Sequence, residues 1–270
     1  ASAASDVYKR HLFSKKSLKK IENQAGSAQL IFSLFNEIHV QENKTLEKLM
    51  NIGVPREKLA LTGSLKDSAK KLVFDEHNMK QFLEAASKQN IWLAACTHAG
   101  EDEIVLKAHK KIGGILLIAP RHIERSKDIA NLSRSMGLIT QLRSEAPELR
   151  KDTVVYIADT MGEMGLWYSM VNIAFIGGSL VERGGHNPIE AAQLETFILH
   201  GPFTYNAEEK YHQLNSLGIA VQIENVDTLV DKLINLQNKN PKKEFKKANS
   251  FLQQNDTALI TALDTIRSAI

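Results

Sequence analysis

The chain has 270 residues, of which 43% are hydrophobic and 24% charged, a composition typical of a soluble globular protein and unlike that of a disordered one. Its formal net charge of +3 gives no general support to nucleic-acid binding. The one cysteine, Cys96, cannot form an internal disulfide, no apolar run reaches the roughly 18 residues of a membrane span, and the polar start is unlike a signal peptide.

Residues 1–58 are predicted to be the last part of a preceding unit, too small to have a core of its own. Apolar residues at helical spacing predict an amphipathic helix near the start, which carries Leu12, Phe13 and Ile21. A short strand over Ile38–Gln41 and a helix through Leu46 follow. One alternative is that another chain covers the apolar side of the first helix, which would make this segment a site of self-association.

From about Leu59 onward strands and helices alternate, which predicts an α/β fold with right-handed crossovers. The predicted strands are short, aliphatic and continuous, as expected of strands buried on both faces of a parallel sheet. They are Leu59–Thr62, Ile91–Cys96, Ile115–Ala119, Val154–Ile157, Ile173–Ile176 and Phe197–Leu199.

Helices are predicted between these strands, and the clearest is Glu101–Ile112, which follows Gly100. It has acidic residues in its first turn and lysines in its last, as the helix dipole favours. The others are Glu124–Met136, Gly162–Met170, Pro188–Leu194, Ala207–Leu217 and a helix from Val226 to about Asn238. Pro241 is predicted to interrupt this last helix, and a long terminal helix from about Phe251 to Ile266 to follow it.

In an open parallel sheet, ligands bind beyond the carboxyl ends of the strands, so the residues just after each strand are the candidates. The most informative run follows Ile173–Ile176. Gly177 and Gly178 would let a ligand approach the backbone closely. Asn187 is a favourable N-cap and Pro188 a favourable first helical residue.

The helix start after Asn187, beside Arg183 and His186, predicts an anion site suited to a nucleotide phosphate, since bare N–H groups and the positive end of the helix dipole meet there. Glu190 in the first turn is placed to accept hydrogen bonds from ribose hydroxyls. The alternative is that the glycines only form tight turns and that Glu190 only complements the dipole.

Three other strand ends carry weaker signals. Asp159 to Glu163 could offer backbone donors at a helix start, or could be a capping arrangement only. Arg121 could contact a phosphate or a base, or could be a surface residue paired with Glu124. The residues after Cys96 could form another donor-rich helix start, and Cys96 itself is interpreted as a core filler within an apolar strand.

Sequence patterns of metal and cofactor sites are absent. The chain has no H-E-x-x-H, no paired C-x-x-C and no D-x-D, so no metal site is expected. It also lacks the dinucleotide and Walker fingerprints and the G-x-S-x-G nucleophile elbow.

Four stretches, in this order and spacing, resemble the motifs of the Kdo transferase family, which transfers 3-deoxy-D-manno-octulosonic acid (Kdo) from CMP-Kdo to a lipid A precursor in lipopolysaccharide biosynthesis. Leu61–Lys66 resembles the family's interdomain G-N-x-K motif as well. The similarity extends over nearly the whole chain. The four stretches are Ala95–Glu101, Ala119–Arg125, Ala158–Leu166 and Phe175–Glu190.

The resemblance implies the carboxyl-terminal portion of a GT-B glycosyltransferase, with a Rossmann-like parallel sheet that has helices on both faces. Residues 59–270 would bind the donor CMP-Kdo, and residues 1–58 would be a helical remnant of the acceptor-binding domain. The terminal helix packing back on the first segment is an open alternative. This chain departs from the family's pattern at Ser64, where asparagine is usual, and at Cys96, where serine is usual.

Carried over residue by residue, the resemblance implies a set of CMP contacts, a set of further donor-site candidates and one catalytic residue. Lys66 would match a lysine that stabilises the transition state, because a cation compensates the charge that develops on the departing phosphate. The CMP contacts would be Pro120, Arg121, Met161, Gly162, Glu163, Asn187, Pro188, Ile189 and Glu190, and the further candidates Ser179, Arg183 and His186.

Transfer also needs a general base, which the family carries on its first domain and which has no counterpart in this chain. The chain is therefore expected to hold the donor without catalysing transfer by itself, and to use no cofactor besides the donor substrate. The family works at the cytoplasmic face of the bacterial inner membrane, so the full-length enzyme would contact a membrane surface. This chain is expected to be soluble and to bind no nucleic acid. Two alternatives stay open: a module that only binds a nucleotide, and another GT-B enzyme that uses a UDP-sugar.

Overall fold

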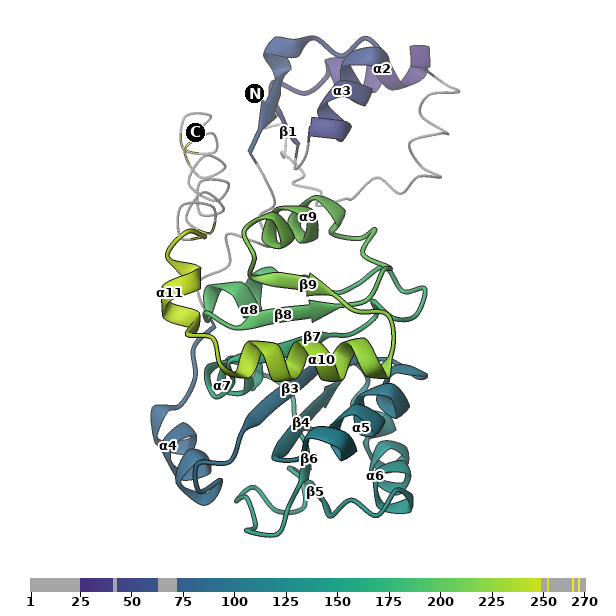
Figure 1. Ribbon diagram of the computed structural model, residues 1–270. Coiled ribbons are helices and arrows are strands. Elements are labelled where there is room, and N and C mark those ends of the chain that lie inside the picture. Colours follow the sequence, from purple (N-terminus) through teal and green to yellow (C-terminus); the bar gives the residue numbers. More distant parts are fainter. Residues whose placement is uncertain are drawn as a thin grey trace. The chain divides into compact units, whose positions relative to one another are not determined.

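The computed structural model describes residues 25–40, 43–62 and 72–248, together with the isolated positions 252, 264 and 267. These residues fall into two compact units, one within 1–68 and 255–270 and the other within 69–254 (Figure 1). The predicted helix near the start, with Leu12, Phe13 and Ile21, lies outside the described residues. So do Gln41, Lys66 and all of the predicted terminal helix except the three isolated positions.

The first unit is built around two short parallel strands, in which Ile38 lies opposite Leu59. It has a small core of its own, contrary to expectation, because five apolar residues within 1–58 pack together with Leu59. Leu59 and its strand group with this unit and not with the start of the second domain as predicted. Its elements are α2 (Ala25–Ser33), β1 (Ile38–Val40), α3 (Asn43–Asn51), η1 (Arg56–Lys58) and β2 (Leu59–Leu61). The buried apolar residues are Val40, Leu46, Leu49, Ile52, Val54 and Leu59.

The second unit contains a sheet of seven parallel strands in the order β5-β6-β4-β3-β7-β8-β9, which confirms the predicted α/β fold. Its elements are α4 (Glu76–Ala85), β3 (Ile91–Thr97), α5 (Glu101–Ile112), β4 (Ile115–Pro120), η2 (Ile123–Arg125), α6 (Ser126–Ser135), β5 (Thr140–Leu142), β6 (Val155–Ile157), α7 (Met164–Ser169), β7 (Ile173–Ile176), α8 (Ile189–Gln193), β8 (Phe197–His200), α9 (Glu208–Ser216), β9 (Ala220–Gln222), α10 (Val226–Gln237) and α11 (Pro241–Phe245).

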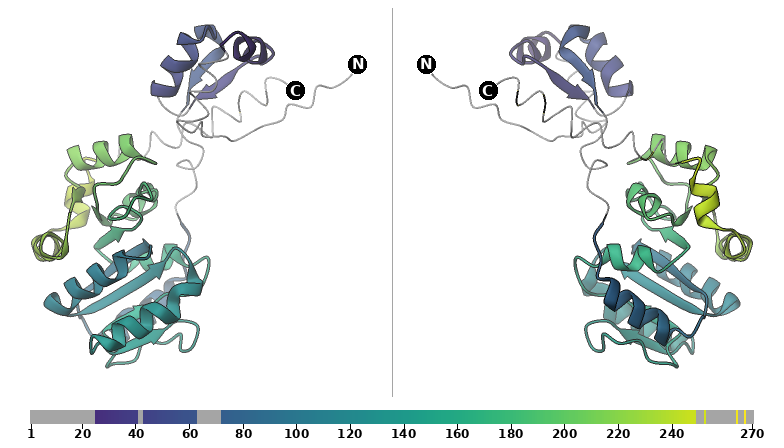
Figure 2. Two further views of the ribbon diagram at one scale, coloured as in Figure 1. Left: turned by 90° about the vertical axis from the view of Figure 1, so that its right-hand side faces the viewer. Right: turned by 90° about the vertical axis from the view of Figure 1, so that its left-hand side faces the viewer.

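Helices cover both faces of this sheet. Helix α5 packs against α10 and α6 on one face, while α4 contacts α7 on the other (Figures 1 and 2). This arrangement follows from right-handed crossovers, because the chain winds first to one side of β3 and then to the other. The central strands are consequently buried on both faces, and every residue of β4 is buried.

A polar contact lies inside this core. His109 of α5 is buried, and its Nδ1 accepts a hydrogen bond from the indole Nε1 of Trp92 at 3.2 Å. Burial lowers the pKa of His109 to about 4, and a hydrogen bond with the backbone of Val154 opposes that fall. A neutral imidazole therefore ties α5 to β3 and to the segment that leads into β6.

Candidate functional site

The sheet changes winding direction between β3 and β7. From β3 the chain proceeds to β4, β5 and β6 on one side, and then crosses to β7, β8 and β9 on the other. Ligands of open α/β sheets bind at such a point, in the crevice beyond the carboxyl ends of the strands. The four predicted stretches follow β6, β4, β3 and β7, which are neighbours in that order, so they lie along one continuous edge of the sheet.

Glu101, the first residue of α5, joins the loops that follow β3 and β7. Its side chain is fully buried, and four donors surround its carboxylate at 2.8–3.0 Å. Burial raises the pKa of the carboxyl, and the four hydrogen bonds oppose that rise. The donors are the backbone N–H groups of His98, Gly178, Ser179 and Leu180.

The backbones of the same two loops touch at Gly177. A Cβ atom there would lie 2.4 Å from the carbonyl oxygen of Cys96, so only glycine fits. Cys96 itself has φ 55° and lies where the pairing of β3 with β4 shifts register, between Ala95 and Thr97. Cys96 lies within β3, as predicted, at a bulge near the end of the strand. Burial raises the pKa of its thiol to about 11, and the negative charge of nearby Glu190 adds to the rise.

Three imidazoles gather above these loops. The Nε2 atoms of His98 and His186 are 2.8 Å apart, with the two ring planes within 1° of each other. The ring of His122 meets that of His98 edge-on, at 5.8 Å between centroids. Burial lowers the pKa of His186 to about 4, and electrostatic interactions with His98 and Arg121 lower it further. The structure thus brings two predicted residues, Arg121 and His186, together with two histidines to which the sequence assigned no role.

The loop after β4 is fixed to the end of β3. The backbone N–H of Arg121 and the guanidinium of Arg125 both donate to the carbonyl oxygen of Thr97, each at 3.1 Å. Arg125 also forms an ion pair with buried Asp102. Pro120 ends β4 and is buried, whereas the Arg121 side chain is exposed beyond the strand.

Helix α8 begins one residue later than predicted, at Ile189, with Pro188 as its N-cap. The Oδ1 atom of Asn187 accepts a hydrogen bond from the Ile189 N–H at 3.3 Å, so Asn187 still caps the helix start. Pro188 and Ile189 are buried, and Glu190 is half-buried at the first turn. Of these four predicted contacts, Asn187 and Glu190 have side chains that reach solvent.

Ser179 and Arg183 have different surroundings within the same loop. The Ser179 side chain is fully buried, donating to the Ile176 carbonyl and accepting from the Gly201 N–H at 2.8 Å. It therefore holds the loops after β7 and β8 together. Arg183 is exposed, and its carbonyl accepts a hydrogen bond from the Asn206 amide at 2.7 Å.

The loop after β6 leads toward the edge of the sheet. Met161 and Gly162 are exposed, while the Glu163 carboxylate forms an ion pair with Arg143, at 2.7 Å from Nη2 to Oε1. Burial acts to raise the pKa of Glu163, but the hydrogen bonds from Arg143 and Thr160 outweigh it and lower the pKa. Arg143 was missed by the sequence analysis because it follows β5, a strand of three residues that gave no apolar run.

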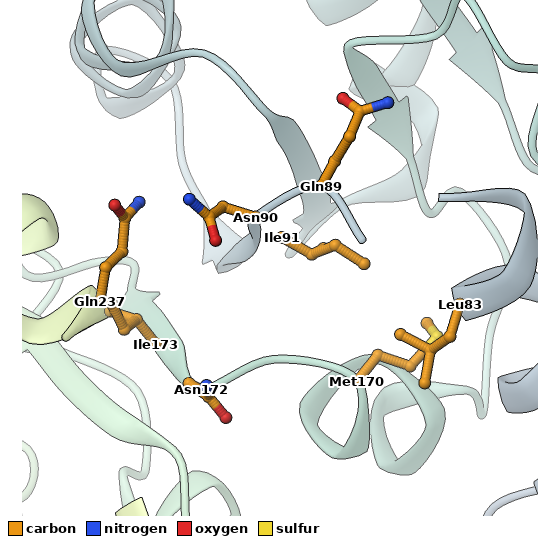
Figure 3. Close-up of a pocket in the computed structure, with 8 residues that line it drawn as sticks. All are labelled: Leu83, Gln89, Asn90, Ile91, Met170, Asn172, Ile173 and Gln237. Atoms are coloured by element: carbon orange, nitrogen blue, oxygen red, sulfur yellow. The ribbon is translucent and has the colours of Figure 1, made fainter. Parts of the chain in front are cut away.

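A hollow of roughly 170 Å³ lies at the opposite edge of the sheet, where β3 and β7 begin (Figure 3). Amide side chains dominate its rim, and it is remote from the carboxyl ends where ligands of this fold class bind. It is lined by Leu83, Gln89, Asn90, Ile91, Met170, Asn172, Ile173 and Gln237.

Within the described part of the chain, no group of three or more His, Cys, Asp or Glu side chains is arranged to hold a metal ion. No helix among the residues described is long and apolar enough to span a membrane. Lys66, the predicted transition-state cation, lies in the segment 63–71 outside the described residues.

Sequence comparison finds relatives among curated 3-deoxy-D-manno-octulosonic acid transferases. The chain is 32% identical to that of Haemophilus influenzae over 253 residues, which cover 88% of this chain and 58% of the relative. It is 31% identical to that of Rickettsia bellii over 265 residues, which cover 94% and 62%. The chain thus spans about three fifths of the length of these relatives. No protein-family model matches it.

Solved structures give a consistent result. The C-terminal CMP-Kdo binding domain of WaaA from Acinetobacter baumannii is 26% identical and superposes with a TM-score of 0.60, covering 66% of this chain and 100% of that domain. A UDP-N-acetylglucosamine 2-epimerase from Listeria monocytogenes superposes with a TM-score of 0.57 at 14% identity, a likeness of fold alone.

Proposed function

The chain is a relative of the Kdo transferases over most of its length, and we propose that it binds the CMP-linked sugar donor of a glycosyltransferase of that family. The observation that carries the proposal is its 26% identity to a CMP-Kdo binding domain that it covers completely. In the whole protein, the bound Kdo is transferred to a lipid A precursor in lipopolysaccharide biosynthesis.

The nucleotide occupies the crevice beyond β4, β3 and β7. Arg121 and Arg183, both exposed in the loops after β4 and β7, supply positive charge to the phosphate. Backbone N–H groups at the start of α8 add donors beside them. Glu190, half-buried in the first turn, accepts hydrogen bonds from the ribose hydroxyls. The phosphate is then recognised by positively charged groups and the ribose by a negatively charged one.

Transfer breaks the bond between Kdo and the CMP phosphate, so negative charge grows on that phosphate. Cations held beside it lower the barrier by compensating this charge, and Lys66 is the proposed residue for that role. The proposal includes no metal ion and no cofactor besides the donor, because the sequence lacks the D-x-D pattern of metal-dependent transferases. The acceptor is a lipid, so the reaction is proposed to take place at the cytoplasmic face of the inner membrane.

Calorimetry with CMP tests the donor site directly. Glu190→Ala is expected to weaken CMP binding about tenfold or more, because a hydrogen bond to a charged group contributes about 1.5–3 kcal/mol. Glu208→Ala is the matched control, since Glu208 is an exposed glutamate in the first turn of α9. Equal affinity of the Glu190→Ala variant and the unaltered chain would contradict the assigned site.

The same titrations separate the alternative of a UDP-sugar enzyme, which the fold likeness to a UDP-sugar epimerase keeps open. Tighter binding of UDP than of CMP would favour that alternative. We expect the reverse order, with CMP bound at least about tenfold more tightly, because a pocket built for one base and one phosphate leaves polar groups unpaired with another ligand.

A further inference from the structure

We propose that His98 and His186 form a proton-linked clasp for an anion, which is protonated more readily when the phosphate of CMP binds beside it. The inference deepens the proposed function and rests on it. It adds a role for two residues whose place in the fold, one after β3 and one after β7, spans the point where the sheet changes direction.

The geometry of the pair limits its protons. At 2.8 Å between the two Nε2 atoms, only one hydrogen fits between the rings. One ring therefore carries its proton on Nε2, and the other offers an Nε2 lone pair and carries its own proton on Nδ1. This neutral pair can gain one further proton, on the free Nδ1 of the donating ring, without breaking the shared hydrogen bond. The clasp thus has two states, which differ by one unit of charge.

Both backbones are fixed, so the contact between the rings is built into the fold. The His98 N–H donates to the buried Glu101 carboxylate at 2.9 Å. The His186 carbonyl accepts a hydrogen bond from the Tyr211 hydroxyl at 2.7 Å, and its N–H donates to the Gly177 carbonyl at 3.3 Å. The two rings remain partly open to solvent, where a ligand can reach them.

The charged groups around the pair are mostly positive, and the carboxylates of Glu101 and Asp102 are bound by donors of the protein. Glu101 is held by four N–H donors, and Asp102 by Arg125. The cations come from the segments after β4 and β7, and they are Arg121, Arg125 and Arg183, with the imidazole of His122 beside them. A third carboxylate, Glu190, lies on α8.

This positive field keeps the pair neutral while no anion is bound. Burial lowers the pKa of His186 to about 4, and burial together with His122 and Arg183 lowers the pKa of His98. A phosphate among the same cations offsets part of their positive charge, which makes the charged form of the pair more favourable. Binding and protonation are therefore coupled, each strengthening the other.

Imidazole NMR measures this coupling in the unaltered chain. Two-bond proton–nitrogen spectra follow the ring nitrogens of the nine histidines over pH, and His98→Gln and His186→Gln assign the two signals. With saturating CMP, we expect the pKa of the pair to rise by about one unit or more. Cytidine, which lacks the phosphate, should leave it unchanged.

The outcomes separate this inference from the proposed function. If CMP shifts signals elsewhere in the crevice but the pKa values of both histidines stay the same, the clasp is wrong and the donor site stands. If CMP shifts no signal at all, the proposed function fails with it. A rise that occurs with intact CMP-Kdo and not with CMP would overturn the assignment to the phosphate, since the sugar acid carries the donor's other anion.

A calorimetric readout gives an independent check. Binding of CMP at pH 5.5, in two buffers of different ionisation enthalpy, yields the number of protons taken up. His186→Gln should take up fewer protons than the unaltered chain, and the difference isolates the pair from the phosphate's own titration. His212→Gln, at an exposed position on α9, is the control and should match the unaltered chain. Equal uptake by all three would overturn the proposal.

Discussion

Glu101 places a carboxylate where a helix start meets two loops, away from solvent. A carboxylate has oxygens for four hydrogen bonds, and all four go to backbone N–H groups that would otherwise be buried without partners. In the sequence it is one acidic residue in a first helical turn, a common feature with a simple dipole explanation. Its role depends on β7 lying beside β3, a contact about 75 residues away in the chain that no local pattern reveals.

Glu101→Gln is expected to destabilise the chain by about 2–4 kcal/mol, because an amide supplies one acceptor oxygen and turns an N–H group toward buried donors. Glu103→Gln is the control, since Glu103 lies in the same helical turn, is exposed and forms an ion pair with Lys107. Urea denaturation monitored by tryptophan fluorescence measures both. A loss of less than about 1 kcal/mol for Glu101→Gln would show that the four hydrogen bonds are dispensable.

The contacts of His98 and Arg143 are likewise not predictable from local sequence patterns. His98 lies within a recognised stretch, but its contact with His186, at 2.8 Å, joins loops that are far apart in the chain. The position of Arg143 at a strand end cannot be recognised until β5 is known. Its ion pair with Glu163 fixes the loop after β6. By contrast, Arg121, Asn187 and Glu190 follow clear strands and could be placed at the carboxyl edge before any coordinates were known.

Elements were predicted best where burial is most complete. Helix α5 and strand β7 have the predicted bounds, because a caps-and-dipole pattern marks the helix and a continuous apolar run marks the strand. β5 and β9 were missed since both are three-residue edge strands. Helix α4 was also missed, although Asp75 caps it by accepting from two backbone N–H groups.

The packing of α5 on the sheet should depend on pH through His109. Its pKa is about 4 in the folded chain and near 6.5 when unfolded, so between these values only the unfolded chain binds the proton. The free energy of unfolding therefore falls as pH drops from 6.5 toward 4, by about 3 kcal/mol from this group.

Denaturation at pH 7 and pH 4.5 measures that loss. In His109→Gln, the loss between the two pH values should be smaller than in the unaltered chain by about 2 kcal/mol, because the titrating group is gone. His212→Gln, with an exposed histidine, should lose as much as the unaltered chain. An identical loss in all three would mean that His109 is charged in the folded state.

At the scale of the whole molecule, the second unit has the attributes of an independent domain. Its seven strands, with helices on both faces, enclose one continuous core from Phe82 to Ala248. A chain of this size buries enough apolar surface to fold without a partner. The solved CMP-Kdo binding domain, which the chain covers completely, is consistent with this division.

A fragment of residues 69–254 is therefore expected to fold cooperatively. Its affinity for CMP should be within about threefold of that of the 270-residue chain, because the contacts proposed for CMP lie within this unit and are retained. Circular dichroism and calorimetry measure the two properties. A fragment that folds but has lost CMP affinity would place part of the site in the first unit, and one that does not fold would contradict the division itself.

The four hydrogen bonds of Glu101 also have a kinetic meaning. A loop that is disordered before binding must be ordered by the ligand, which slows association and weakens affinity. Here the loops after β3 and β7 are ordered when the chain folds, so an arriving nucleotide meets a surface already in its final shape. At the proposed site, we therefore expect encounter to be governed by diffusion and by the attraction of Arg121 and Arg183, and residence time by how quickly contacts break.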